Sequence, residues 1–135
     1  MKLLSIIVSA ALLLAAANSV AQTKAGDLVA DIPFAFVVAD RTLPPGHYIV
    51  NRLNDNLGIH AGQNPNLFVP THSAQRPAGE NTSKMVFHRY GDTYFLEEVW
   101  VGSSSIGRAL FPSRAEHKLK ESGVEREIAA VRLGK

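Results

Sequence analysis

The sequence predicts a mainly β fold, a small antiparallel barrel or sandwich with one short C-terminal helix. Runs rich in valine, isoleucine, tyrosine and phenylalanine alternate with clusters of glycine, proline and asparagine, which is the pattern of short strands joined by turns. One hairpin, residues 84–100, carries apolar side chains on both faces, so each face needs cover from the rest of the domain. The other expected strands are 32–38, 47–53, 57–60 and 67–72.

Two pairs containing glycine predict tight turns. Pro45-Gly46 suits a type II turn, because proline presets its φ and glycine accepts a positive φ. Gly91-Asp92 suits a two-residue type II′ turn with positive φ at Gly91. Counting outward from this turn predicts the cross-strand pairs Tyr90–Thr93, Arg89–Tyr94, His88–Phe95, Phe87–Leu96, Val86–Glu97 and Met85–Glu98.

The same hairpin supplies the candidate binding residues. Regular alternation places His88 and Glu97 diagonally on one face, where they form either a structural polar pair or a general base with its orienting carboxylate. No nucleophile or substrate-binding group is identifiable beside them, so the structural interpretation is favoured and no catalytic residue is predicted. Arg89 is expected to stack on Tyr94, and Trp100 to be buried. The candidate set is His88, Arg89, Tyr90, Tyr94, Glu97 and Trp100.

The C-terminal segment predicts a short helix followed by a strand. Ser113 stands three residues before Glu116, the spacing of a capping box, and Gly123 is a natural helix end. Ala115 and Leu119 form a narrow apolar stripe on this helix. Propensity in 124–133 favours helix, whereas alternation puts Val124, Ile128 and Ala130 on one side of a strand. We favour a last strand that covers a sheet edge.

Residues 1–21 have the three parts of a secretory signal peptide. Lys2 is followed by an apolar run, 3–17, and by the small-x-small cleavage pattern that ends at Ala21. The apolar run is shorter than the roughly 20 residues that span a bilayer. We therefore expect cleavage before Gln22, a periplasmic or secreted product without a membrane span, and a single β-rich domain over 22–135.

Composition excludes several classes of function. The formal net charge is +2, and lysine and arginine form no cluster before the C-terminal segment, which argues against a nucleic-acid partner. The chain has no cysteine, so thiol catalysis and zinc-thiolate sites are excluded. GSSSIGRA, residues 102–109, has phosphate-loop glycine spacing, but Arg108 replaces the lysine. The five histidines form no metal-binding pair, so neither a metal nor another cofactor is predicted.

Three blocks, IPFAFVVADRTLPPGHYIV, MVFHRYGDTYFLEEVW and SSIGRALFPSRAE, resemble a family of small exported bacterial proteins. The resemblance covers most of the chain after the signal peptide and implies a compact β-rich domain. It brings no activity or ligand with it. Separately, LPPGHYIV is similar to the turn and strand of prealbumin-like surface modules, but we favour the simpler interpretation of these eight residues, a tight turn entering a strand.

Three hypotheses of function follow. The first is an exported, non-catalytic β domain that binds or supports components of the cell envelope or extracellular space. The second is a small barrel that binds an apolar molecule, which an interior lined by small side chains would favour. The third, disfavoured, is a hydrolase-like enzyme that uses His88. An envelope protein or a small apolar molecule is therefore the expected partner.

Overall fold

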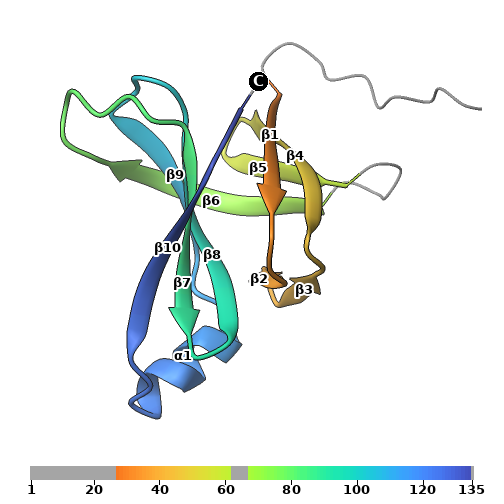
Figure 1. Ribbon diagram of the computed structural model, residues 1–135. Coiled ribbons are helices and arrows are strands. Elements are labelled where there is room, and N and C mark those ends of the chain that lie inside the picture. The colour runs from red at the N-terminus through yellow and green to blue at the C-terminus, as the bar shows by residue number, and fades with distance from the viewer. Residues whose placement is uncertain (1–26, 62–66, 135) are drawn as a thin grey trace, which may run out of the picture.

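Ten strands and one short helix make up the described part of the chain, residues 27–61 and 67–134 of a computed structural model (Figure 1). The predicted cleavage site at Ala21 and Gln22 lies outside these residues. The elements before the gap are β1 (Leu28–Ile32), β2 (Phe36–Val38), β3 (Arg41–Leu43), β4 (Gly46–Leu53) and β5 (Asn56–His60). Those after it are β6 (Leu67–Gln75), β7 (Lys84–Tyr90), β8 (Thr93–Trp100), β9 (Ile106–Leu110), α1 (Arg114–Glu121) and β10 (Arg126–Arg132). Over the same residues, no helix is long and apolar enough to cross a membrane.

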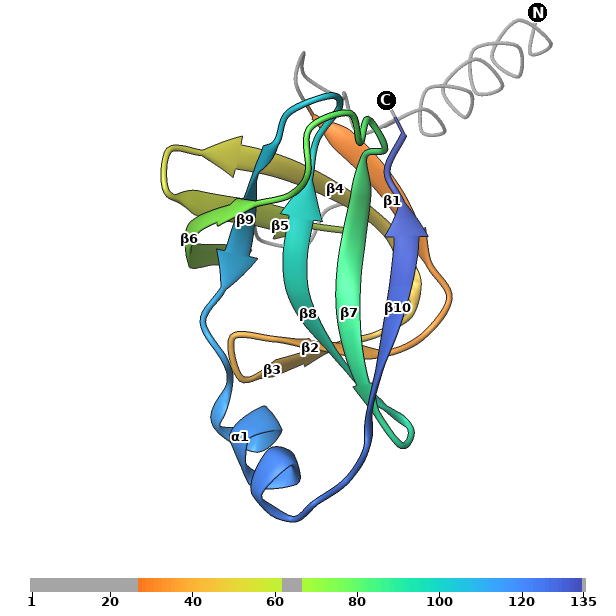
Figure 2. The same cartoon turned by 90° about the vertical axis from the view of Figure 1, so that its left-hand side faces the viewer.

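The strands form two walls, joined by β6. One wall contains β1, β4 and β5, and the other contains β10, β7, β8 and β9 (Figures 1 and 2). The first residues of β6, 67–70, pair with β5, while 71–75 pair with β9, so one long strand passes from one wall to the other. This arrangement confirms the predicted mainly β fold with one short helix.

The sheet is not closed into a barrel, and its architecture is sandwich-like. Between β1 and β10 the link is an isolated bridge of Val29 with Gly134, which exchange two backbone hydrogen bonds of 2.9 Å. The sheet is also mixed rather than purely antiparallel, because β2 runs parallel to the first half of β8. β9 pairs with the second half of β8, along the same edge that β2 occupies in the first half. One edge of β8 therefore pairs with two different strands.

Apolar side chains from both walls meet in a single core. Phe36 and Phe87 are fully buried, with ring centroids 5.6 Å apart in an edge-to-face arrangement. Ile32, Leu57 and Met85 lie in the same cluster. Each such side chain contributes about 1.5–3 kcal/mol by leaving water. A chain without disulfides depends on this burial and on its strand pairing.

The β7–β8 hairpin confirms the predicted turn but corrects the register beyond it. Gly91 has φ +62°, and the predicted pairs from Tyr90–Thr93 to Phe87–Leu96 are present. A β-bulge then makes Glu97 an extra residue, so Val86 pairs with Glu98 and Met85 pairs with Val99. The predicted Val86–Glu97 and Met85–Glu98 pairs are therefore wrong.

The bulge also reverses which side chains face the core. Val99 lies in the main core cluster with Met85 and Phe87, whereas the predicted register would have placed Glu98 and Trp100 on that face by regular alternation. Trp100 is buried as predicted, but its ring lies on Gly107, where a Cβ atom would collide with it.

The turn predicted at Pro45-Gly46 is wrong, because Gly46 begins β4 without a positive φ. The positive φ angles lie at Ala39 (+48°) and Asp40 (+65°), the two residues between β2 and β3. Two successive positive values define a type I′ hairpin turn, whose twist suits the flanking strands. The predicted strand 32–38 is likewise split into the end of β1 and all of β2.

The C-terminal predictions are confirmed in outline and corrected in orientation. Ser113 caps α1, Gly123 has φ +79° after its end, and β10 pairs with β7 as a final strand. However, Ile128 on the predicted apolar side of β10 is 69% exposed, while Leu133 is buried. In α1 the buried residue is Glu116 rather than an apolar one.

Candidate functional site

Three acid–base side chains from three separate elements meet beneath α1. His88 comes from β7, Glu97 from β8 and Glu116 from α1, and we call them the acid–histidine cluster. The Nδ1 atom of His88 lies 3.3 Å from Oε1 of Glu97 and 3.2 Å from Oε2 of Glu116. Exposed fractions of the side chains are 16%, 12% and 2% for His88, Glu97 and Glu116. The predicted contact between His88 and Glu97 is thus present, with Glu116 as a third partner.

Local backbone features place these side chains. Glu97 is the extra residue of the β8 bulge, and a bulge redirects the side chain that it carries. Glu116 lies in the first turn of α1, where its N–H donates a 3.1 Å hydrogen bond to Oγ of the helix cap Ser113. Its carboxylate faces the sheet and accepts a 3.0 Å hydrogen bond from the hydroxyl of Tyr90. Of the candidate set, His88, Tyr90 and Glu97 therefore belong to one network.

Because two carboxyl groups are buried side by side, the pKa of one is raised and the pKa of the other is lowered. Burial, the hydrogen bond with Glu116 and the charge of Glu116 together raise the pKa of Glu97 to about 9. Burial alone would also raise the pKa of Glu116, but hydrogen bonds from Glu97, His88 and Tyr90 outweigh it and lower that pKa. Burial and the hydrogen bond to Glu116 raise the pKa of Tyr90 to about 12. At neutral pH, Glu97 is protonated and donates to the Glu116 carboxylate.

These contacts bear on the hypothesis of a catalytic base. His88 Nδ1 faces two carboxyl oxygens, and its side-chain hydrogen bond within the described residues goes to Glu116 rather than to a hydroxyl nucleophile. A base–nucleophile pair needs such a hydroxyl within hydrogen-bond reach. The arrangement instead suits holding a proton or a cation between the three groups.

The remaining candidate residues lie elsewhere. Arg89 stacks over Tyr94 at 5.4 Å, as predicted, and Tyr94 also stacks on Phe34 with a centroid separation of 3.7 Å. Trp100 lies beneath the guanidinium of Arg76 at 5.0 Å. These three candidates therefore make packing contacts away from the acid–histidine cluster.

A second candidate site is a cavity of about 220 Å³ between the two walls, called the interwall cavity here. Asn51 on β4 is one of its lining residues, but its side-chain amide oxygen, buried without a hydrogen-bond partner, lies against Gly58, which does not line the cavity. Gly58 on β5 pairs with Asn51, and a Cβ atom at Gly58 would collide with that amide. The absence of a side chain at Gly58 thus gives the amide its space. The cavity is lined by Leu28, Val50, Asn51, Arg52, Leu57, Val99, Val101, Ser104, Ile106, Gly107 and Arg108.

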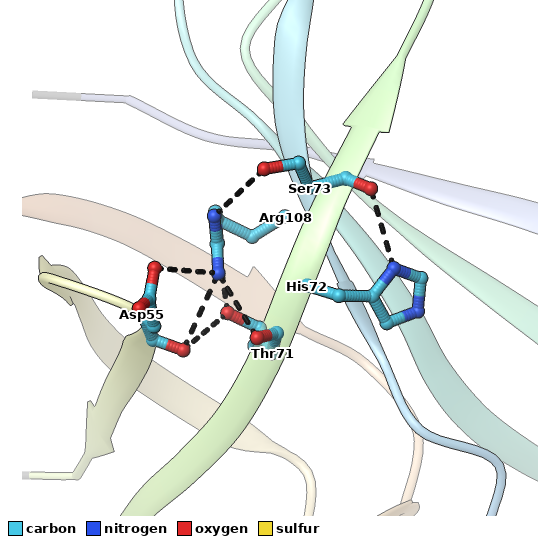
Figure 3. A network of polar contacts seen from close by, with 5 residues as sticks. All are labelled: Asp55, Thr71, His72, Ser73 and Arg108. Atoms are coloured by element: carbon cyan, nitrogen blue, oxygen red, sulfur yellow. Dashed lines mark hydrogen bonds and ion pairs between the residues drawn. The ribbon is translucent and has the colours of Figure 1, made fainter.

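A polar network holds the β6–β9 side of this cavity (Figure 3). Arg108 is buried and donates from Nε to Oγ1 of Thr71 at 2.8 Å and from Nη1 to Oγ of Ser73 at 3.2 Å. Its Nη2 lies 3.3 Å from the carboxylate of Asp55 in the β4–β5 turn. Figure 3 also shows His72, whose Nδ1 lies 3.2 Å from the carbonyl oxygen of Ser73. The arginine that breaks the phosphate-loop pattern therefore ties the two walls together.

Sequence reasoning missed Glu116 and the interwall cavity. Glu116 was assigned to a capping box, which accounted for it without any contact to the sheet. The cavity depends on how the two walls pack, and no local pattern in the sequence indicates it.

No family model matches the chain, and comparison with curated proteins and with solved structures finds no match either. The resemblance to small exported bacterial proteins therefore stays a prediction. The chemistry of the two sites carries the functional assignment.

Proposed function

We propose that this chain is an exported, non-catalytic β domain that binds a small, mainly apolar molecule in the interwall cavity. The observation that carries this proposal is the interwall cavity itself, which has a volume of about 220 Å³ and a mostly apolar lining. Concave, mainly apolar cavities are typical binding sites for small molecules. A ligand there gains about 25 cal/mol for each Å² of apolar surface that leaves water.

The cavity defines the class of ligand. Its lining includes Leu28, Val50 and Ile106, which favour an apolar body. At about 30 Å³ for each water molecule, 220 Å³ corresponds to about seven waters, so the ligand is small. A one-ring or short-chain apolar molecule has this size and chemistry.

The export part of the proposal rests on the signal-peptide pattern of residues 1–21. Its non-catalytic part is supported by the hydrogen bonding of His88: among the described residues its ring contacts are with carboxyl groups at Nδ1, and no hydroxyl is hydrogen-bonded to the ring. The enzymatic alternative is therefore disfavoured, while binding of a small molecule uses a feature that the fold already holds open.

The test uses two probes that differ in one group. Toluene suits the apolar lining, and benzyl alcohol adds a hydroxyl that would lose its contacts with water. In ¹⁵N- and methyl-resolved NMR titrations, toluene is expected to shift the resonances of Leu28, Val50 and Leu57 and to bind more tightly than benzyl alcohol.

A matched pair of variants controls for surface effects. Ile106→Trp places a large ring at the cavity, whereas Ile128→Trp makes the same change at an exposed position of β10. Binding is expected to be lost only in Ile106→Trp. Native mass spectrometry of protein recovered from its own compartment then identifies any retained molecule. Unshifted lining resonances with both probes, together with a stable protein complex, would overturn this proposal in favour of a structural role.

A further inference from the structure

We infer that the acid–histidine cluster, formed by His88, Glu97 and Glu116, is a binding site for a divalent transition-metal ion, with Zn²⁺ as the best-fitting one. The cluster is separate from the interwall cavity, because none of its residues lines that cavity. This inference therefore does not depend on the proposed ligand.

The donor spacing matches a tetrahedral centre. Zinc binds imidazole nitrogen and carboxylate oxygen at about 2.0–2.2 Å, and tetrahedral geometry then separates neighbouring donors by about 3.3–3.5 Å. The observed separations from Nδ1 of His88 are 3.3 Å to Glu97 and 3.2 Å to Glu116. One donor atom from each of the three residues lies within 4.8 Å of the others. The spacing therefore needs little rearrangement to accept the ion.

The donor types select the class of metal. Calcium and magnesium prefer sites made entirely of oxygen ligands, whereas an imidazole nitrogen favours zinc and its transition-metal neighbours. Three protein ligands leave a fourth position for water, as in open zinc sites. Binding of the ion displaces the proton of Glu97 to the solvent, and the two carboxylates then offset the charge of a divalent ion in a largely buried position.

The surroundings supply orientation and rigidity. The hydroxyl of Tyr90 donates to Oε2 of Glu116, the kind of outer contact that orients a ligating carboxylate. Glu97 is presented by a bulge, and Glu116 lies in a helix turn fixed by the Ser113 cap. His88 remains 16% exposed at its side chain, which leaves an entry path for the ion. Three elements thus hold the donors before any ion arrives.

The experiment is isothermal titration calorimetry with ZnCl₂ at pH 7.5, on protein first stripped with EDTA and exchanged into buffer. We expect one saturable site for each chain. Glu97→Gln and His88→Gln should each weaken binding more than about 100-fold, because each removes a ligand. Tyr90→Phe should weaken binding about 10- to 100-fold, the usual effect of losing an outer partner.

The matched control is His117→Gln on α1. His117 forms an exposed pair with Glu121 at 3.1 Å, so it offers a surface histidine and carboxylate without a third donor. This variant should bind zinc as the parent does. Thermal melts of every variant check that each one is folded before its affinity is compared.

X-ray absorption at the zinc edge of the parent protein tests the site without any substitution. One nitrogen and at least two oxygens at about 2.0–2.2 Å are expected in the first shell. No saturable heat, an oxygen-only shell, equal binding of Mg²⁺, or affinity lost in His117→Gln but kept in His88→Gln would overturn the inference.

Discussion

Replacing Glu97 with glutamine is expected to stabilise the fold at neutral and mildly alkaline pH and to flatten its pH dependence. Glutamine keeps the shape and an N–H donor for Glu116, but it cannot ionise. The parent residue has its pKa raised from 4.5 to about 9 by burial and by Glu116. The substitution therefore removes one proton equilibrium while preserving the packing of the acid–histidine cluster.

The sign and size follow from proton linkage. Between pH 4.5 and 9 the unfolded chain has Glu97 ionised, while the folded chain keeps it protonated. The stability from this group is fully present below pH 4.5 and is lost as pH rises through about 9, at about 1.4 kcal/mol for each pH unit. From pH 5 to 8 this amounts to at most about 4 kcal/mol. Glu116, whose pKa is lowered, acts oppositely and loses its stabilisation at acidic pH.

Urea unfolding at pH 5, 6, 7 and 8 with EDTA present measures this effect through Trp100, the one tryptophan of the chain. The parent should lose free energy of unfolding as pH rises, and Glu97→Gln should show a much smaller slope. Glu127→Gln, at an exposed carboxylate on β10, should retain the slope of the parent. Equal slopes for Glu97→Gln and the parent would refute a raised pKa at Glu97.

Two further substitutions test the hairpin turn and the link between the walls. Gly91→Val should lower the free energy of unfolding by about 1 kcal/mol or more, because φ +62° strains the backbone of a branched residue. No atom lies within 4 Å of the new Cβ, so a steric clash does not contribute. An unchanged melting temperature would contradict the assigned turn. Arg108→Met should lower the free energy of unfolding by about 1.5–3 kcal/mol, because it removes the charged hydrogen bonds to Thr71 and Ser73 and the contact with the exposed Asp55. Urea unfolding with an unchanged midpoint would show that this network contributes little.

The strands and the hairpin turn were predictable because they depend on neighbours in the sequence. Gly91 fixes its turn through one backbone angle, and the residue pairs next to it follow by counting. The prediction failed at Glu97, because counting assumes two-residue alternation and a bulge adds a residue. A signal was available: the regular register would have placed Glu98 beside Met85 and Phe87, and so buried a carboxylate in the apolar core.

The candidate site was only half predictable for a different reason. His88 and Glu97 belong to one hairpin, so their proximity follows from local pairing. Glu116 joins them from a helix 19 residues after Glu97, and its docking depends on how α1 packs against the sheet. Which face of β10 is buried was unpredictable for the same reason. Ile128 and Leu133 are both apolar, and only contact with the other wall decides which of them is buried.

The bridge between Val29 and Gly134 has a consequence for how the protein is made. β1 pairs with β4 along one edge, and Gly134 bridges its other edge. β7 pairs with β8 along one edge and with β10 along the other. Both second edges therefore receive their partners only when residues 126–134 have been synthesised. A premature stop before residue 126 leaves the β7 edge open, and such edges are templates for pairing with other chains. Truncated products should therefore aggregate rather than accumulate as partly folded monomers. The newly made chain then becomes soluble only once its last strand, β10, is present.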